Sequence, residues 1–267
     1  MKRKISGAAF AAAPFLLAPA AHAQWSSAYS APRNAAVDAA GARSVEVEAA
    51  AGSLRVEGKP GLRQVQVTGT ARSSSQDVLG RIRLIAERRG DVVFIRADMP
   101  DNDDYGNYSA MLDLVIEVPQ GMNADVADGS GDAKILNVGS LEVTDGSGEL
   151  TIIGATGSVR INDGSGNITV ENVGGDVKVT DGSGEMNVRN VTGSFTVENA
   201  GSGGIRATDI RGSVVVEHDG SGDVDVEKVG RDLRVESKGS GEISYTAVSG
   251  QIDIPDRRRG RRDRSEE

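Results

Sequence analysis

Cysteine is absent from this chain of 267 residues, and aromatic residues make up only 3% of it. Without cysteine there can be no disulfide bridges and no thiolate metal centres, so packing and hydrogen bonds must supply the stability. The shortage of aromatic side chains disfavours a globular enzyme with a deep core. The chain has instead 35 glycines, which suit a thin, repetitive fold filled by valine, isoleucine and leucine.

Long hydrophobic runs are also scarce, and the one clear apolar stretch lies near the N-terminus, at residues 8–20. Basic residues from Lys2 to Lys4 precede it and the small-residue site Ala21–Ala23 follows it, which together are typical of a secretory signal. Its short length and two prolines disfavour a permanent membrane helix. The sequence therefore predicts a signal peptide at residues 1–23 and an exported protein. The periplasm is the expected location, with secretion or surface display as alternatives.

Positive charge is outnumbered, because 39 acidic residues stand against 30 lysines and arginines and the formal net charge is −9. Such an acidic body repels phosphates, which argues against nucleic acid as a partner. The exception is the segment 255–267, which is rich in arginine. We expect this tail to be disordered, and either to keep the protein soluble or to contact an anionic lipid or polymer.

The dominant pattern is a tetrapeptide, Asp-Gly-Ser-Gly, that returns through the second half of the chain. Counting two variants, its first glycines are separated by 17, 18, 18, 19, 19 and 19 residues. A unit this short cannot close its own core, so each copy must bury its apolar face against the next. The copies begin at Asp128, Asp145, Asp163, Asp181, Ala200, Asp219 and Lys238.

Apolar residues recur at five fixed places in each copy. In one copy they are Leu150 and Ile152, then Ala155, then Val159 and Ile161. Alternation of this kind indicates strands with one buried face. The sequence therefore predicts an all-β fold, a parallel β-helix or β-solenoid with rungs of about 18 residues. Its strands pair in parallel about 4.8 Å apart, and right-handed coiling is the default for such connections.

The remaining segments show weaker patterns. Residues 24–43 are rich in alanine and serine, and we expect a flexible lead-in. Residues 44–122 alternate without the tight repeat, which predicts irregular β coils and a hairpin that form an N-terminal cap. The regular solenoid is predicted over residues 123–254. A second glycine column marks the other corner, and we expect glycine to adopt positive φ at both corners. This column is Gly139, Gly157, Gly175, Gly193, Gly212 and Gly250.

The strand-rich front, the segment Leu114–Gly121 (Leu-Val-Ile-Glu-Val-Pro-Gln-Gly) and the glycine-rich coils that follow resemble a bacterial exported family. That family carries the name of a putative adhesin domain of unknown function. The resemblance covers residues 44–254 and implies a β-helix. It implies no catalytic residues, because the shared motifs are structural rather than chemical.

The aspartates that open the repeats are the candidate binding residues. Carboxylates stacked about 4.8 Å apart repel by about 1 kcal/mol even in water. One reading is that each accepts hydrogen bonds from the amides of its own Gly-Ser-Gly turn. The other is that calcium lies between rungs, held by carboxylate oxygens. No other cofactor is expected, and the candidate calcium ligands are Asp128, Asp145, Asp163 and Asp181.

Other motifs carry less weight. The acidic segment 101–106 resembles the start of an EF-hand loop, but Leu112 stands where that loop needs glutamate, so we expect an exposed acidic loop. His218, Asp219 and Ser221 invite comparison with a catalytic triad, yet the same serine recurs in copies that have no histidine. The sequence contains no zinc-protease, phosphate-loop or nucleophile-elbow motif.

Together these observations favour a non-catalytic exported module, structural or adhesin-like, whose polar ladders contact a macromolecule of the cell envelope or surface. A calcium-stabilised solenoid is a variant of this hypothesis. The alternative is a polysaccharide-active enzyme on the same fold, which would need convergent charged side chains in a cleft. The outward positions are mixed in charge instead, and Glu142 and Arg160 are predicted to meet on adjacent rungs.

Overall fold

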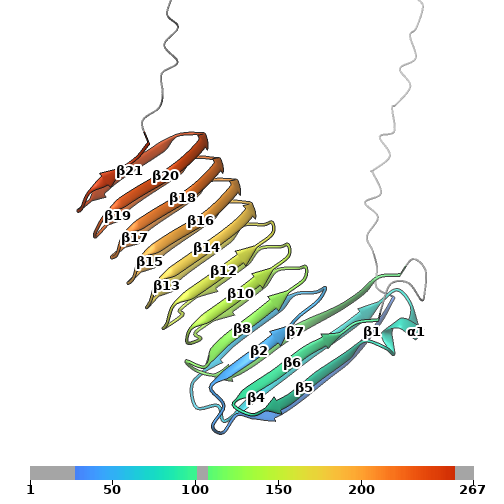
Figure 1. Cartoon of the computed structure of the whole chain (residues 1–267). Helices are drawn as coiled ribbons and strands as arrows, with labels where there is room; N and C mark the ends of the chain where they lie inside the picture. Colours follow the sequence, from blue (N-terminus) through green and yellow to red (C-terminus); the bar gives the residue numbers. More distant parts are fainter. Residues whose placement is uncertain (1–27, 101–107, 256–267) are drawn as a thin grey trace, which may run out of the picture.

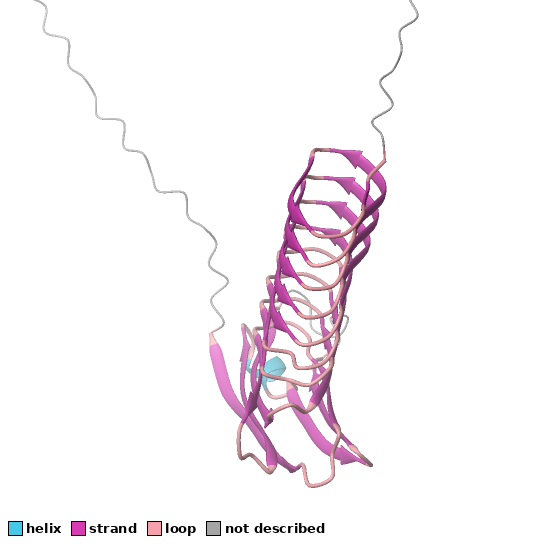
Figure 2. Ribbon diagram, turned by 90° about the vertical axis from the view of Figure 1, so that its left-hand side faces the viewer, coloured by secondary structure: helices cyan, strands magenta, loops and turns pink. Residues whose placement is uncertain are grey.

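A computed structural model describes residues 28–100 and 108–255, which form two 11-stranded sheets that face each other (Figures 1 and 2). The predicted signal peptide, the acidic segment 101–106 and the tail from residue 256 lie outside the described residues. In spatial order, the first sheet contains β1 (Tyr29–Asp38), β4 (Gln64–Ser73), β7 (Ala110–Pro119), β3 (Leu54–Lys59), β9 (Ala133–Leu136), β11 (Leu150–Ile153), β13 (Ile168–Val173), β15 (Met186–Val191), β17 (Ile205–Ile210), β19 (Val224–Val229) and β21 (Ile243–Val248). The second contains β22 (Ile252–Asp253), β20 (Leu233–Ser240), β18 (Val214–Ser221), β16 (Phe195–Ser202), β14 (Val177–Ser183), β12 (Val159–Asp163), β10 (Leu141–Asp145), β8 (Asn123–Asp128), β2 (Ser44–Glu48), β6 (Val92–Asp98) and β5 (Arg83–Arg89).

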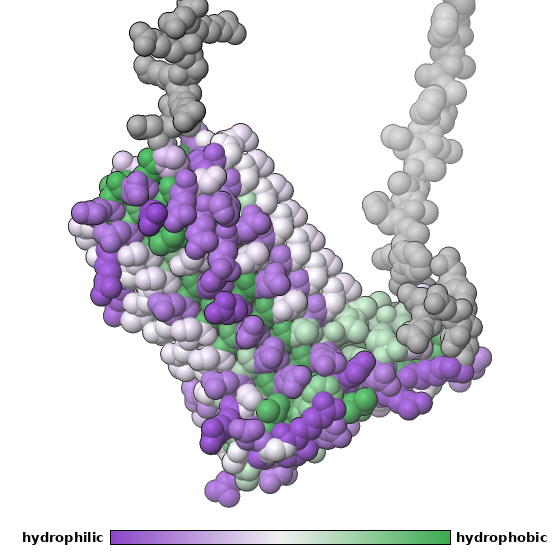
Figure 3. Space-filling view, in the orientation of Figure 1, coloured by the Kyte–Doolittle hydropathy of each residue, from purple (hydrophilic) through white to green (hydrophobic). Residues whose placement is uncertain are grey.

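From β8 onward each rung gives one strand to each sheet, and each strand pairs in parallel with its equivalent one rung away. Leu141 pairs with Val159, and Val159 pairs with Val177, so apolar residues remain in columns. The face of the molecule seen in Figure 3 is hydrophilic to neutral over most of its area, with several hydrophobic patches. The predicted all-β parallel solenoid is confirmed. The first 19-residue rung absorbs its extra residue in a β-bulge, where the register between β14 and β16 skips Glu198.

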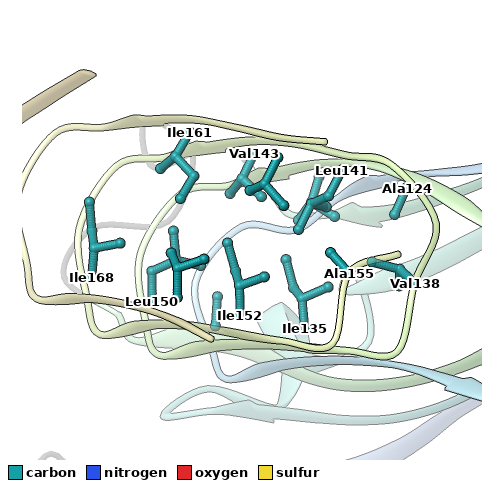
Figure 4. Packing of buried hydrophobic residues seen from close by; sticks show 14 of the residues in the cluster. Ala124, Ile135, Val138, Leu141, Val143, Leu150, Ile152, Ala155, Ile161 and Ile168 are labelled. Carbon is teal, nitrogen blue, oxygen red and sulfur yellow. The ribbon is translucent and has the colours of Figure 1, made fainter. Parts of the chain in front are cut away.

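Branched aliphatic side chains from the two sheets meet inside the stack (Figure 4). Val143 and Ile161 lie on one side and Leu150, Ile152 and Ile168 on the other, all of them 0–1% exposed. Full burial of one such side chain contributes about 1.5–3 kcal/mol. Since every rung repeats this pattern, the apolar columns account for the cohesion of a molecule with no disulfides.

The first rungs are stacked out of chain order. β2 and β3 form a rung directly next to β8 and β9, whereas β6 and β7 form the rung on its other side. The chain therefore returns past the β2–β3 rung before it begins β8. Residues 44–59 were predicted to lie in the irregular cap, but they belong to the regular stack. Their alternation matches the later rungs, but they lack the Gly-Ser-Gly signature that marks the repeat.

Antiparallel strands close the N-terminal end of the stack. β4 pairs with β7, and β5 with β6 as the predicted hairpin. The predicted flexible lead-in is wrong for residues 29–38, which form β1 and pair with β4 along ten residues. Alanine gives little periodic signal, so backbone pairing rather than apolar patterning defines this strand. Arg33 secures it by donating to the carbonyls of Leu79 (2.8 Å) and Ile82 (2.7 Å).

Helical structure is limited to one short element in the described residues. This is α1 (Gln76–Leu79), which the side chain of Ser75 caps. Within the described part of the chain, no helix is both long enough and apolar enough to cross a membrane.

The Gly-Ser-Gly corner needs both of its glycines, for different reasons. The second glycine generally has a φ between 124° and 142°, a region that side chains disfavour. The first approaches the preceding rung: a Cβ on Gly146 would lie 2.3 Å from the carbonyl oxygen of Gly129. Backbone packing between rungs thus excludes side chains from this corner.

The opposite corner corrects one expectation. Glycines of the second column, such as Gly193, do not adopt positive φ; a Cβ there would lie 2.6 Å from the Gly175 carbonyl oxygen. The left-handed residue occurs two or three positions earlier, and asparagine is common there because it tolerates this conformation. That column is Asn137, Gly154, Asn172, Asn190, Asp209, Lys228 and Ala247.

Lys228 has the longest side chain in this column and a φ of 57°. Left-handed backbone of this kind disfavours lysine more than glycine or asparagine. We expect Lys228→Gly to raise the free energy of unfolding by about 0.5–1 kcal/mol, because glycine removes the left-handed strain. Urea denaturation measures the change. Thr208→Gly, in the regular strand β17, is the control and should lower stability by a similar amount. Equal destabilisation by both variants would contradict the assignment of strain to Lys228.

Candidate functional site: the aspartate column and the outer groove

The repeated aspartates form one column inside the stack. Asp128, Asp145, Asp163 and Asp181 are register partners on successive rungs. Each follows two inward-facing apolar residues at alternate positions of its strand, so its side chain also points inward. They are 2–5% exposed. The sequence correctly predicted the column, although not its burial.

Most carboxylates of this column lack hydrogen-bond partners. Both side-chain oxygens of Asp128, Asp145 and Asp163 are buried and unpaired. Only Asp181 follows the turn-amide reading, since its Oδ1 accepts from the amide of Ser183 at 3.0 Å. A buried carboxylate without partners is strongly unfavourable when ionised. The column is therefore the least satisfied polar feature among the described residues.

Burial shifts the protonation of these groups. It raises the pKa of Asp128 to about 7, with the charge of Asp145 as a second cause. Burial, then the charges of Asp145 and Asp181, raise the pKa of Asp163 to about 6. Burial also raises the pKa of Asp145 and Asp181, and nearby turn amides offset part of the shift. The amides near Asp145 and Asp163 lie outside hydrogen-bonding geometry, so we regard this offset as small.

The two variant repeats reduce repulsion at the far end of the column. Ala200 is buried between Asp181 and Asp219 in the same register. Lys238 is the register partner of Asp219 on the next rung, and its positive charge lowers the pKa that burial raises. After four successive carboxyl groups, the column thus continues with an uncharged spacer, one more carboxyl group and a cation.

The column does not resemble a compact calcium site. It supplies one carboxylate per rung, whereas calcium takes six to eight oxygen ligands. Among the described residues, no three acidic or histidine side chains converge on one metal position. Calcium binding by Asp128, Asp145, Asp163 and Asp181 stays a prediction.

A thermal melt tests that prediction directly. If calcium occupies the column, millimolar Ca²⁺ should raise the melting temperature by several degrees over EDTA, because a ligand that binds only the folded state stabilises it. Asp145→Asn should abolish the rise. An unchanged melting temperature in both media would remove calcium from the account.

A shallow groove of about 560 Å³ runs along the outside of the stack at the start of strands β8, β10, β12, β14 and β16. Its floor is a corner ladder in which a polar side chain on one rung accepts from an amide of the next. Asn123 accepts from Ser140 (2.9 Å), and Asp176 from Ser194 (2.8 Å). Sequence reasoning missed this ladder, although a polar residue follows every glycine of the second column.

Charges of both signs line the groove. Asp125 and Glu142 are register partners, and burial followed by the charge of Glu142 raises the pKa of Asp125. Arg160 and Lys178 follow on the next two rungs. Glu142 and Arg160 are in register as predicted, but they form no ion pair within the described residues, where Lys178 pairs with Glu198 instead at 2.5 Å.

The residues of the triad-like motif do not come together. His218 is exposed whereas Asp219 is buried, because neighbours in a strand point to opposite faces. The register partner of His218 is Ser237, and that of Ser221 is Ser240. The acidic segment 101–106 lies outside the described residues.

Comparison with known proteins identifies similar solved structures only. No protein-family model matches the chain, and a search of curated proteins finds no significant match. A putative adhesin from Bacteroides fragilis is 15% identical, with 82% of this chain and 98% of that one covered and a TM-score of 0.41. A putative cell adhesion protein from Clostridium sporogenes is 13% identical, with 85% and 100% covered and a TM-score of 0.33. A putative lipid binding protein from Parabacteroides distasonis is 14% identical, with 84% and 97% covered and a TM-score of 0.37.

Proposed function

We propose that this chain is an exported, non-catalytic, adhesin-like module that presents the outer groove to a macromolecule of the cell envelope or surface. The observation that carries the proposal is the groove itself, a continuous track across several rungs whose lining combines polar and charged side chains with apolar atoms. Its backbone spacing is fixed by the stack, so a ligand meets donors and acceptors at regular intervals without ordering a flexible loop.

Unpaired charge at the groove supports binding rather than simple ladder stabilisation. Arg160 is exposed and has no ion-pair contact among the described residues, although its charge acts on Glu198 one strand beyond Lys178. Asp125 and Glu142 stand side by side with like charge on the adjoining rungs. A partner that carries both cationic and anionic groups would relieve this repulsion and pair with Arg160.

Cosedimentation of the mature chain with bacterial envelope fractions tests the proposal. Arg160→Glu combined with Lys178→Glu should reduce the bound fraction several-fold, and the reduction should shrink at high salt because exposed charges are screened. Lys134→Glu is the matched control, since Lys134 is also an exposed cation but lies on the outer face of the other sheet. Loss of binding in the control alone, or equal binding by all three proteins, would overturn the assignment of the groove.

A further inference from the structure

The two ends of the stack are built differently. At the N-terminal end, the edge strands are β1 and β5, which pair antiparallel with their neighbours and contact one another. At the C-terminal end, the edges of the two sheets are β21 and β22, and among the described residues no such cap follows them. A stack of repeats usually needs a terminal unit with a polar outer face, and within the part of the chain that the structure describes, the added layer is at the N-terminal end.

The last rung exposes the apolar columns that earlier rungs bury. Tyr245 continues the column of Val226, yet it is 44% exposed where Val226 is 0%. Ile252 continues the column of Leu233 and is 43% exposed where Leu233 is 0%. Apolar surface is visible at this end in Figure 3. The register places both residues in the inward-facing apolar columns, but no further rung in the described chain covers them.

The chain that follows is chemically unsuited to cover this end. Residues 256–267 contain no apolar side chain, so their sequence supplies no hydrophobic residue to pack against Tyr245 or Ile252. An unpaired strand edge beside exposed apolar side chains favours pairing with another strand edge. The occupant therefore has to supply both a strand edge and an apolar surface, and the same end of a second copy supplies both.

Charge also favours a second copy at this end. Residues 123–229 carry 18 acidic and seven basic side chains, so the middle of the stack repels its own kind. Residues 230–255 carry four acidic and three basic side chains, and are close to neutral. The C-terminal end is the part of the regular stack where two copies approach with little electrostatic opposition.

We propose that two copies of this chain dock through their C-terminal ends, as a two-fold dimer in which β21 pairs antiparallel with β21 of the partner subunit. A two-fold axis perpendicular to the sheets reverses strand direction, so each sheet continues across the interface as an antiparallel pair. The contact is isologous and closes on itself. The capped N-terminal ends then face away from each other, and no fibre forms.

Analytical ultracentrifugation of the mature full chain tests the dimer. The wild type should sediment with twice the chain mass at micromolar concentration. Tyr245→Lys combined with Ile252→Lys should raise the dissociation constant at least about tenfold, because two buried cations oppose the contact. Val115→Lys is the matched control: Val115 is 42% exposed but lies on β7, far from this end in the sheet order, and it should leave the dimer intact. A monomer at every concentration, or a dimer insensitive to the double variant, would overturn the proposal.

Spin-label distances test the orientation of the two copies. The chain has no cysteine, so Ser249→Cys places one label beside the C-terminal end and Gln64→Cys places one on β4. β4 and β21 are nine strand positions apart, or about 43 Å at 4.8 Å per strand. C-terminal docking predicts a short distance between labels at 249 and about 90 Å between labels at 64. A short distance at 64, or similar distances at both sites, would contradict it.

Discussion

Gly184→Ala should lower the free energy of unfolding by about 3–5 kcal/mol, a severe loss for a methyl group added at the surface of a protein. Gly184 has a φ of 142°, and a Cβ at this position would lie 1.6 Å from the carbonyl oxygen of Gly166. That oxygen belongs to the backbone of the preceding rung, so it can move only if the two rungs separate. Denaturant unfolding followed by circular dichroism measures the loss.

The neighbouring rung offers a matched control. Gly204 directly follows Gly203 at the same corner, but a Cβ on Gly204 would come no closer than 3.5 Å to other atoms. Gly204→Ala should change stability by less than about 0.5 kcal/mol or slightly increase it, since alanine restricts the unfolded chain. If both variants are equally tolerated, close stacking of the corners is wrong.

The second large effect concerns pH. Stability should fall as pH rises from about 4 to about 8, the reverse of the usual behaviour of paired carboxylates. In the folded state the pKa of Asp128 is about 7 and that of Asp163 about 6, whereas an unfolded aspartate titrates near 4. The folded chain therefore binds more protons in this window, so its stability is complete below about pH 4 and is lost as pH rises through the folded-state values. For Asp128 alone the loss is about 2 kcal/mol, because solvent screening reduces the effect of the full pKa shift.

Two substitutions assign this pH dependence to the column. Asp128→Asn should stabilise the protein by about 2 kcal/mol at pH 8 and have little effect at pH 4.5, because it removes a buried charge that exists only at the higher pH. Ala200→Asp should steepen the loss, because it joins Asp181 and Asp219 into one continuous series of carboxyl groups. A free energy of unfolding that stays constant or rises between pH 5 and pH 8 would contradict this prediction. It would show that other contacts offset the buried negative charges of the column.

The regular solenoid could be predicted because its physical determinants repeat. Columns such as Val159 and Val177 align only if strands pair in parallel one repeat apart, and the structure places them so. The spacing of 19 residues shows that the later repeats are longer by one residue, and the register between β14 and β16 continues after Glu198 is skipped. Periodicity of this kind carries information about neighbours in space, not only about local conformation.

Features without a repeat could not be predicted in this way. β1 is defined by backbone pairing and by Arg33, neither of which leaves an apolar pattern. The chain returns past the β2–β3 rung before it forms β8. Alternation of apolar and polar residues identifies strands but does not specify the order in which they stack. The left-handed corner was assigned to Gly193 and its equivalents because glycine is the strongest turn signal, whereas asparagines such as Asn190 adopt that conformation.

The candidate site was predicted in position and only partly in chemistry. The spacing of Asp128, Asp145 and Asp163 placed them in one column, but not inside the core, because the corner residue could face either way at the end of a strand. The outer groove depends on the distance between corners of successive rungs, which becomes visible only once the register is known.

Disulfide formation between engineered cysteines on adjacent rungs tests the in-register parallel stack most directly. Thr144 and Asn162 are exposed register partners, about 4.8 Å apart across the sheet, and a disulfide can span that separation. The account predicts rapid oxidation of Thr144→Cys with Asn162→Cys, and slow or no oxidation of Thr144→Cys with Arg160→Cys, which lie about 8 Å apart on the diagonal. Preferential oxidation of the diagonal pair, or none in either, would contradict the register on which the aspartate column, the groove and the exposed last rung all depend.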